Sequence, residues 1–317
     1  MPSPDADSSR LDDAARAGWL YFIAGNTQDE IARKLNVSRA TAQRLVSLSR
    51  SERLITFRLE HPIAACMELS QRLQDRYALK HCDVVPTDPA SASNLVGIAE
   101  AAGSFLEQRL RSDEPTIFAL GTGRSLRAAV DHIPPMNCPS HTLVSLVGNI
   151  SPDGSASFFD VLTRLGDLTR AKHYPMPLPV VAPSRSERDQ FLSLAPVRKV
   201  RSLAEKADVT LVGVGQLDDT APLFVDGFIT RKDLDDLRKM GAVGDVAGWV
   251  FDENGRIVEG STNERVTSVP PQPDSPRLVI GVAMGASKVA AVEAALKGRL
   301  INGLITNEKT AAAILGS

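Results

Sequence analysis

The sequence predicts an α/β protein: a small all-α, winged helix-turn-helix domain over residues 1–60, then a larger α/β domain with a mostly parallel sheet over residues 61–317. Helical patterns separated by caps and a short turn fill the first segment, whereas short apolar runs alternate with helical patterns in the second. A content of 43% hydrophobic and 23% charged residues over 317 positions is typical of globular domains.

Composition argues against several classes of protein. No apolar run approaches the roughly 20 residues that a membrane span needs, and the N-terminus is acidic rather than basic and then apolar. We therefore expect a cytoplasmic protein without a membrane span or signal peptide. The five histidines lack metal-ligand spacing, and no cofactor is indicated. Three widely separated cysteines predict buried thiols rather than disulfides or a metal site: Cys66, Cys82 and Cys138.

Positive charge is concentrated near the N-terminus although the whole chain has a net charge of -2. Residues 1–30 hold two basic and six acidic side chains, whereas residues 31–60 hold seven basic and two acidic ones, a net charge of +5. Such a segment could face DNA, or its arginines could coat a solvated helical face.

A first helix is predicted between Leu11 and Ala24 and is ended by Gly25 and Asn26. Its apolar residues recur at helical spacing, which predicts that they share one buried stripe. That stripe consists of Ala15, Trp19, Phe22 and Ile23.

A second and a third helix follow at close spacing. Thr27 and Glu30 form a capping-box pattern ahead of a helix from Gln28 to Lys34, and Ser38 is suited to cap a helix that runs to Arg50. Asn36 and Val37 make the turn between these helices. Ile31 and Leu35 on the second helix, with Leu45, Val46 and Leu48 on the third, are the expected buried side.

A helix, a short turn and a capped helix have the spacing of a helix-turn-helix, whose second helix enters the major groove by its N-terminal residues. Arginine can bond guanine edges and glutamine adenine edges, but each residue could instead grip phosphate or make no contact. The candidates for double-stranded DNA are Ser38, Arg39, Thr41, Gln43 and Arg44. Beyond them, alternating Ile55, Phe57 and Leu59 predict a wing strand, from which Arg58 could touch phosphate.

A helix from Pro62 to Leu79 is expected to link the two domains and to help the chain dimerise. After it, the runs CDVV, TIFAL, TLVSLVG, VTLVGVG, GWVFD and LVIGVAM read as strands. Helices are expected at 91–111, 124–132 and 156–168. This alternation favours a mostly parallel sheet covered on both faces.

Ligands of parallel sheets bind at the carboxyl ends of the strands, so the glycines that follow three apolar runs are candidates for a ligand site. After TIFAL come Gly121, Thr122, Gly123, Arg124 and Ser125, which open a helix and could cradle an anion or merely form a tight turn. The loop matches neither the dinucleotide fingerprint nor a Walker A loop.

Three further residues complete the candidate ligand site. Gln216 follows a second glycine cluster, and Lys288 lies beyond a third, where it could contact an anion or be an ordinary exposed lysine. Asp245 could hydrogen-bond sugar hydroxyls or cap a turn.

Taken together, the helix-turn-helix, the GTGRS loop, LVGVG, GAVGDVAGWVFDENG and the final VIGVAMGASKVAAVEAALKGRLINGLITNEKTAAAIL resemble the SorC family of sugar-responsive transcription regulators over nearly the whole chain. The resemblance implies an effector domain folded like glucosamine-6-phosphate deaminase and ribose-5-phosphate isomerase, which binds a sugar, polyol or sugar phosphate without converting it. It also implies that the loop Gly121–Ser125 holds a phosphate or sugar end, that Asp245 and Lys288 close the site, and that the protein is a homodimer or homotetramer.

Two hypotheses follow. The first is a DNA-binding regulator controlled by a carbohydrate ligand. The second is a sugar-phosphate isomerase or deaminase in which Asp245 or Glu308 would serve in acid-base chemistry. No organised set of catalytic residues, such as HExxH or GxSxG, supports the enzyme, so we assign no catalytic residues.

Overall fold

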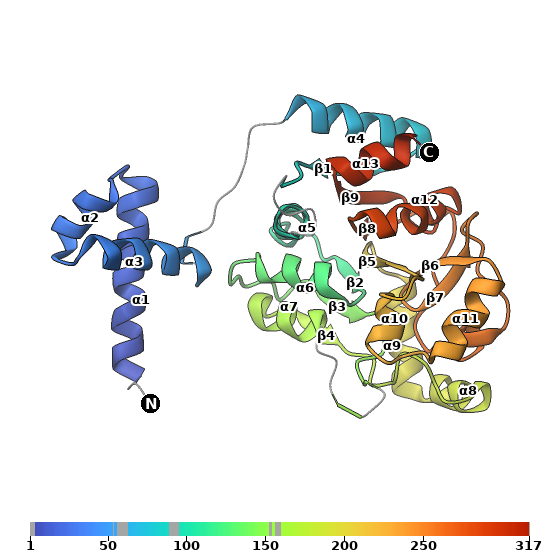
Figure 1. Cartoon of the computed structure of the whole chain (residues 1–317). Coiled ribbons are helices and arrows are strands. Elements are labelled where there is room, and N and C mark those ends of the chain that lie inside the picture. Colours follow the sequence, from blue (N-terminus) through green and yellow to red (C-terminus); the bar gives the residue numbers. More distant parts are fainter. Residues whose placement is uncertain are drawn as a thin grey trace. The chain divides into compact units, whose positions relative to one another are not determined.

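The computed structural model describes residues 4–52, 54–55, 63–88, 95–151, 154–155 and 160–316. The chain divides into two compact units, Met1–His61 and Pro62–Ser317 (Figure 1). None of the helices in the described ranges is both long and apolar enough to cross a membrane.

The N-terminal unit is built from helices that share a small core. The core residues are Ala17, Ile31, Ala32, Ala42 and Val46. Gly18 permits the close approach of the first and third helices, because a β-carbon there would collide with Ser49. The elements are α1 (Pro4–Gly18), the π-helical turn η1 (Trp19–Ile23), α2 (Gln28–Leu35) and α3 (Arg39–Ser51).

Both predicted helix caps are confirmed. The Thr27 N–H donates to Glu30 Oε2 at 2.8 Å, and the Glu30 N–H donates back to Thr27 Oγ1 at 3.4 Å. Ser38 Oγ accepts from the Thr41 N–H at 3.1 Å. Between the two helices Asn36 adopts a left-handed conformation with φ 53°, which turns the chain from α2 into α3.

The stripe predicted for the first helix is wrong at Trp19 and Ile23, whereas Phe22 packs against the core of this unit and Ala15 is half-buried. Trp19 and Ile23 are 54% and 66% exposed, whereas Ala14 and Ala17 are fully buried. The π-helical turn η1 changes the helical phase at the end of α1, and the small residues Ala14, Ala17 and Gly18 are buried instead.

The buried side of the third helix differs in part from the prediction, and the predicted wing strand is not described. Leu45 and Leu48 are only half-buried, and Ser49 is buried beside Val46. The predicted wing lies mostly outside the described residues, Phe57, Arg58 and Leu59 included, while Ile55 is in a bend.

The second unit is organised around one sheet, as the sequence predicted. Among the described residues nine strands join it. Seven of them lie in the order β1-β9-β8-β5-β2-β3-β4, and every pair along that path is parallel. The hairpin β6–β7 continues from β5 with antiparallel pairing. The strands are β1 (His81–Val85), β2 (Ile117–Leu120), β3 (Thr142–Ser145), β4 (Lys172–Tyr174), β5 (Val209–Gln216), β6 (Ala242–Val246), β7 (Trp249–Asp252), β8 (Leu278–Val282) and β9 (Gly303–Asn307).

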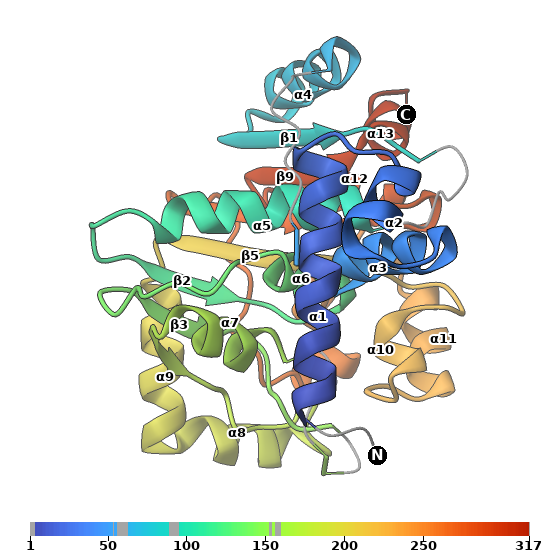
Figure 2. The ribbon, with the colours of Figure 1, turned by 90° about the vertical axis from the view of Figure 1, so that its left-hand side faces the viewer.

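Helices cover both faces of the sheet, which explains why its strands are apolar on both sides. Figure 2 shows α5, α6 and α7 on one face of the sheet. Along β2, Phe118 and Leu120 join the core under these helices, whereas Ala119 joins the core under α4, α9, α12 and α13. A third, smaller core lies between the hairpin and α10 and α11. The helices are α4 (Ala64–Tyr77), α5 (Val96–Leu110), α6 (Arg124–Asp131), α7 (Val161–Thr169), α8 (Arg185–Ser193), α9 (Ala195–Glu205), α10 (Pro222–Val225), α11 (Arg231–Lys239), α12 (Val289–Lys297) and α13 (Glu308–Gly316), with short 3-10 turns η2 (Ser261–Glu264) and η3 (Ala286–Lys288).

The neighbouring strands β2 and β5 mark the point where the strand order reverses. From β2 the chain proceeds to β3 and β4 on one side, whereas from β5 it proceeds to β8 and β9 on the other. In open α/β sheets a crevice forms beyond the carboxyl ends of the strands at such a point. The GWVFD run was expected to form a strand of the parallel sheet. It forms β7 instead, which pairs with β6 in the antiparallel hairpin.

Candidate functional site

A cavity of about 710 Å³ opens beyond the carboxyl ends of β2, β5 and β8. Its volume lies in the range of small-molecule sites. All eight residues that the sequence analysis chose as ligand candidates line it, although they come from four separate segments. These residues are Gly121, Thr122, Gly123, Arg124, Ser125, Gln216, Asp245 and Lys288.

The loop Gly121–Ser125 forms one wall of this cavity. The Gly121 N–H donates to the Leu211 carbonyl at 2.8 Å, which ties the loop to β5. Gly123 has φ 121°, a conformation that L side chains rarely adopt, and precedes α6 without a side-chain cap. The first turn of α6, Arg124 to Leu126, lines the cavity, and helix N-termini favour anions and other oxygen ligands.

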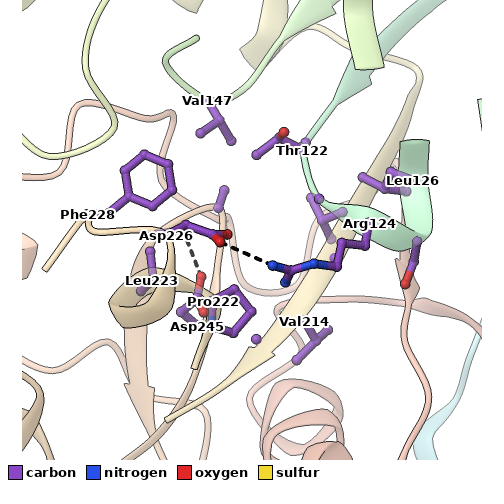
Figure 3. A pocket seen from close by; sticks show the side chains of 18 of the residues that line it. Thr122, Arg124, Leu126, Val147, Val214, Pro222, Leu223, Asp226, Phe228 and Asp245 are labelled. Carbon is purple, nitrogen blue, oxygen red and sulfur yellow. Dashed lines mark hydrogen bonds and ion pairs between the residues drawn. The ribbon is translucent and has the colours of Figure 1, made fainter. Parts of the chain in front are cut away.

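Arg124 reaches from the start of α6 toward Asp226, which follows α10. Nη2 of Arg124 lies 3.1 Å from Oδ1 of Asp226, and both residues line the cavity (Figure 3). Sequence reasoning did not single out Asp226. It stands in a loop without a motif, and 102 residues separate it from its partner.

Asp245 lies on β6 directly opposite Gly215 on β5. Its Oδ2 accepts a hydrogen bond from the Gly248 N–H at 3.0 Å. A β-carbon at position 215 would overlap Oδ1, so the buried carboxylate fits only because that residue is glycine. Burial raises the pKa of Asp245 to about 6, although the Gly248 hydrogen bond and nearby Lys288 oppose the shift.

Lys288 is half-buried rather than an ordinary exposed lysine. Its Nζ donates to the Val214 carbonyl at 2.7 Å, which holds the ammonium at the end of β5. Burial lowers the pKa of Lys288, while Asp245 opposes that shift and Arg124 adds to it.

Gln216 offers an acceptor that has no partner within the described part of the chain. Its Nε2 donates to Thr220 Oγ1 at 3.1 Å, while its buried Oε1 makes no hydrogen bond there. Buried polar atoms are rarely left unsatisfied, so Oε1 is suited to accept from a ligand hydroxyl. Apolar side chains complete the cavity walls: Val147, Leu223, Phe228 and Met284.

Glu308, the other carboxylate considered for acid-base chemistry, is not among the described residues that line the cavity. Its Oε1 accepts from the Thr87 N–H at 2.9 Å, and its Oε2 lies 3.9 Å from Cys66 Sγ. Glu308 thus ties α13 to α4 and to the end of β1.

No group of three or more His, Cys, Asp or Glu side chains in the described ranges could hold a metal ion. The three cysteines are buried and unpaired, as predicted, and burial raises the pKa of the Cys82 thiol to about 12.

The N-terminal candidates lie at the start of α3. Arg39, Gln43 and Arg44 are exposed, while Thr41 is half-buried and its Oγ1 lies 2.9 Å from Ser38 Oγ. Ser38 and Thr41 are therefore engaged in the cap, whereas the three longer side chains can extend into solvent.

Comparisons with known proteins agree with these features. The chain matches a family described as "Putative sugar-binding domain" over residues 61–316. It is 30% identical over 312 residues to the erythritol catabolism regulatory protein EryD of Brucella abortus, covering 98% of each chain. It is 27% identical over 321 residues to the sorbitol operon regulator of Klebsiella pneumoniae, covering 98% of this chain and 99% of that protein.

The same fold is found among solved structures. The full-length sorbitol operon regulator SorC from Klebsiella pneumoniae superposes with a TM-score of 0.69 at 24% identity, covering 96% of this chain and 99% of that one. The resemblance inferred from the sequence motifs is confirmed: the chain belongs to the SorC family of sugar-binding transcriptional regulators.

Proposed function

We propose that this protein is a cytoplasmic transcription regulator in which residues 1–60 bind double-stranded operator DNA and residues 61–317 bind a small carbohydrate that controls a catabolic operon. The observation that carries the proposal is the cavity, because it gathers Arg124, Gln216, Asp245 and Lys288 at the switch point of a parallel sheet. The names of the relatives support the same role, since both regulate the use of a polyol.

The cavity offers complementary partners to a polyhydroxy compound. Asp245 and Oε1 of Gln216 can accept hydrogen bonds from hydroxyl groups, and the positive end of the α6 dipole favours oxygen atoms. Phe228 and Leu223 can pack against the carbon skeleton. In this role the site binds its ligand without converting it.

Control of DNA binding requires that the ligand bind two conformations or assembly states with different affinity. A coupling free energy of about 1 to 3 kcal/mol would make a useful switch. A homodimer or homotetramer would present pairs of α3 helices about a two-fold axis, so the operator should be roughly palindromic.

The DNA-binding role is tested by Arg39→Ala combined with Arg44→Ala in the full-length protein. We expect loss of the footprint upstream of the regulated operon, because two exposed basic side chains at the start of α3 are removed. Arg50→Ala, at the other end of α3, is the control and should reduce binding much less. A footprint that survives the double substitution would contradict the assignment.

The effector role is tested by a thermal-shift screen of sugars, polyols and their phosphates. A ligand at a hundred times its Kd stabilises the native state by about 2.7 kcal/mol. Asp245→Asn should weaken binding about tenfold, because hydrogen bonds to a charged acceptor are roughly twice as strong. A flat response across the panel counts against carbohydrate sensing, and turnover of a sugar phosphate would favour an enzyme.

A further inference from the structure

The charged side chains of the cavity are balanced. Among the described residues that line it, the cations are Arg124 and Lys288 and the anions are Asp226 and Asp245. Each cation already has an oxygen acceptor from the protein, at 3.1 Å for Arg124 and at 2.7 Å for Lys288. The described lining of the cavity therefore carries no excess positive charge at neutral pH.

A phosphate group bound at the start of α6 would lie beside the negative charge of Asp226, although Arg124 and the helix N-terminus would otherwise favour it there. Arginine and helix N-termini are favoured phosphate partners, and Arg124 begins α6. The Asp226 carboxylate, however, accepts a hydrogen bond from the Arg124 guanidinium. A phosphate that approached Arg124 would have to displace Asp226 or lie against its negative charge.

The backbone holds Asp226 in place beside the cavity. Its N–H donates to the Pro222 carbonyl at 2.9 Å, and the Gly227 N–H donates to the Phe224 carbonyl at 3.0 Å. Gly227 has φ 78°, which turns the chain directly after Asp226. Asp226 thus lies in a folded turn, and Figure 3 shows its carboxylate directed at Arg124.

Resting on the proposed carbohydrate-sensing function, we propose that Asp226 is a specificity-determining residue that excludes phosphorylated ligands, so that the cavity takes an uncharged polyol or sugar. The remaining polar atoms agree with such a ligand. Gln216 presents an unsatisfied acceptor, and hydroxyl groups can donate to it whereas an ionised phosphate oxygen cannot. Attraction for the hydroxyl groups and repulsion of phosphate together set the selectivity.

The test uses the full-length protein, calorimetry and matched ligands: erythritol with erythritol 4-phosphate, sorbitol with sorbitol 6-phosphate, and inorganic phosphate alone. For the pair that binds, the wild-type protein should prefer the uncharged member at least tenfold, and inorganic phosphate should not shift its Tm. Asp226→Asn should gain at least tenfold affinity for the phosphorylated member and a Tm increase in inorganic phosphate. Adding Arg124→Gln to Asp226→Asn should remove both gains.

Asp219→Asn is the matched control. Asp219 also pairs with arginines, at 2.7 Å from Arg231 and 2.9 Å from Arg238, but it is not among the lining residues described. Its substitution should leave the ligand preference unchanged. Asp226→Ser removes the same charge with a different side chain. It keeps the test valid if the asparagine variant fails to fold.

The outcomes separate the two proposals. Tighter binding of the phosphorylated member by the wild-type protein, or no gain in either Asp226 variant, overturns the role of Asp226 and leaves carbohydrate sensing intact. Absence of binding for every ligand in every variant overturns this inference, and a flat response across the wider thermal-shift panel overturns carbohydrate sensing as well.

Discussion

The two units place their candidate functional side chains in opposite ways. In the N-terminal unit Arg39, Gln43 and Arg44 are exposed on α3 and take no part in its core. In the second unit Asp245 is buried against Gly215, and Lys288 is hydrogen-bonded to the backbone of β5. Substitutions should therefore separate binding from stability in the first unit and change both in the second.

The largest expected effect is that of Gly215→Ala. A β-carbon there overlaps the Asp245 carboxylate, which must move and lose its hydrogen bond to Gly248. We expect a loss of about 3 kcal/mol or more in the free energy of unfolding, measured by urea denaturation, together with loss of ligand binding. Gly213→Ala on the same strand is the control for stability, since the nearest atom to an added β-carbon there would be 3.6 Å away. Equal losses for both variants would contradict this picture.

Asp245→Asn should have the next largest effect, with the opposite sign. The folded protein raises the pKa of Asp245 from 3.8 to about 6, so its stabilising contribution is complete below pH 4 and is lost as the pH rises through 6. Asparagine does not titrate, and the variant should gain up to about 3 kcal/mol over the wild type between pH 4 and pH 7. Urea midpoints of both proteins at the two pH values measure the gain. A difference independent of pH would refute the buried-charge explanation.

Ser38→Ala should have a smaller effect that is confined to the N-terminal unit. It removes the acceptor for the Thr41 N–H, and loss of such a cap costs about 1 kcal/mol. The Tm of that unit should fall, and circular dichroism of the full chain measures the change. Ser47→Ala, at an exposed position within the same helix, should change the Tm little. Equal changes in Tm for the two variants would contradict a stabilising role of the Ser38 cap.

The smallest effect on stability should come from Arg39→Ala combined with Arg44→Ala. The ion pair of Arg39 with Asp29, at 3.5 Å, is exposed on both sides, so stability should change by no more than about 0.5 kcal/mol. If both arginines contact phosphate, the slope of log K against log salt should fall by about 2 units. Fluorescence anisotropy at several salt concentrations measures it. An unchanged slope with weaker sequence discrimination would indicate base contacts instead.

The features that sequence alone determined arise from interactions between near neighbours. The Thr27 and Glu30 capping box and the Ser38 cap each join residues three positions apart. The apolar runs identified five strands of the parallel path, β1, β2, β3, β5 and β8, but missed β4 and β9. The rule that ligands bind at strand ends led to Gly121, Gln216 and Lys288, which line the cavity. Short-range backbone preferences and strand periodicity can be predicted from the sequence without knowledge of the fold.

Only the tertiary structure decided which distant groups meet. The pairing register of β5 and β6 sets Asp245 over Gly215, and the turn after α10 brings Asp226 to Arg124. The crossing of α1 with α3 buries Ala14 and Ala17 and leaves Trp19 exposed, against the pattern of hydrophobicity. Such contacts depend on strand order, register and helix crossing, which arise from packing of the whole chain and leave no local signal in the sequence.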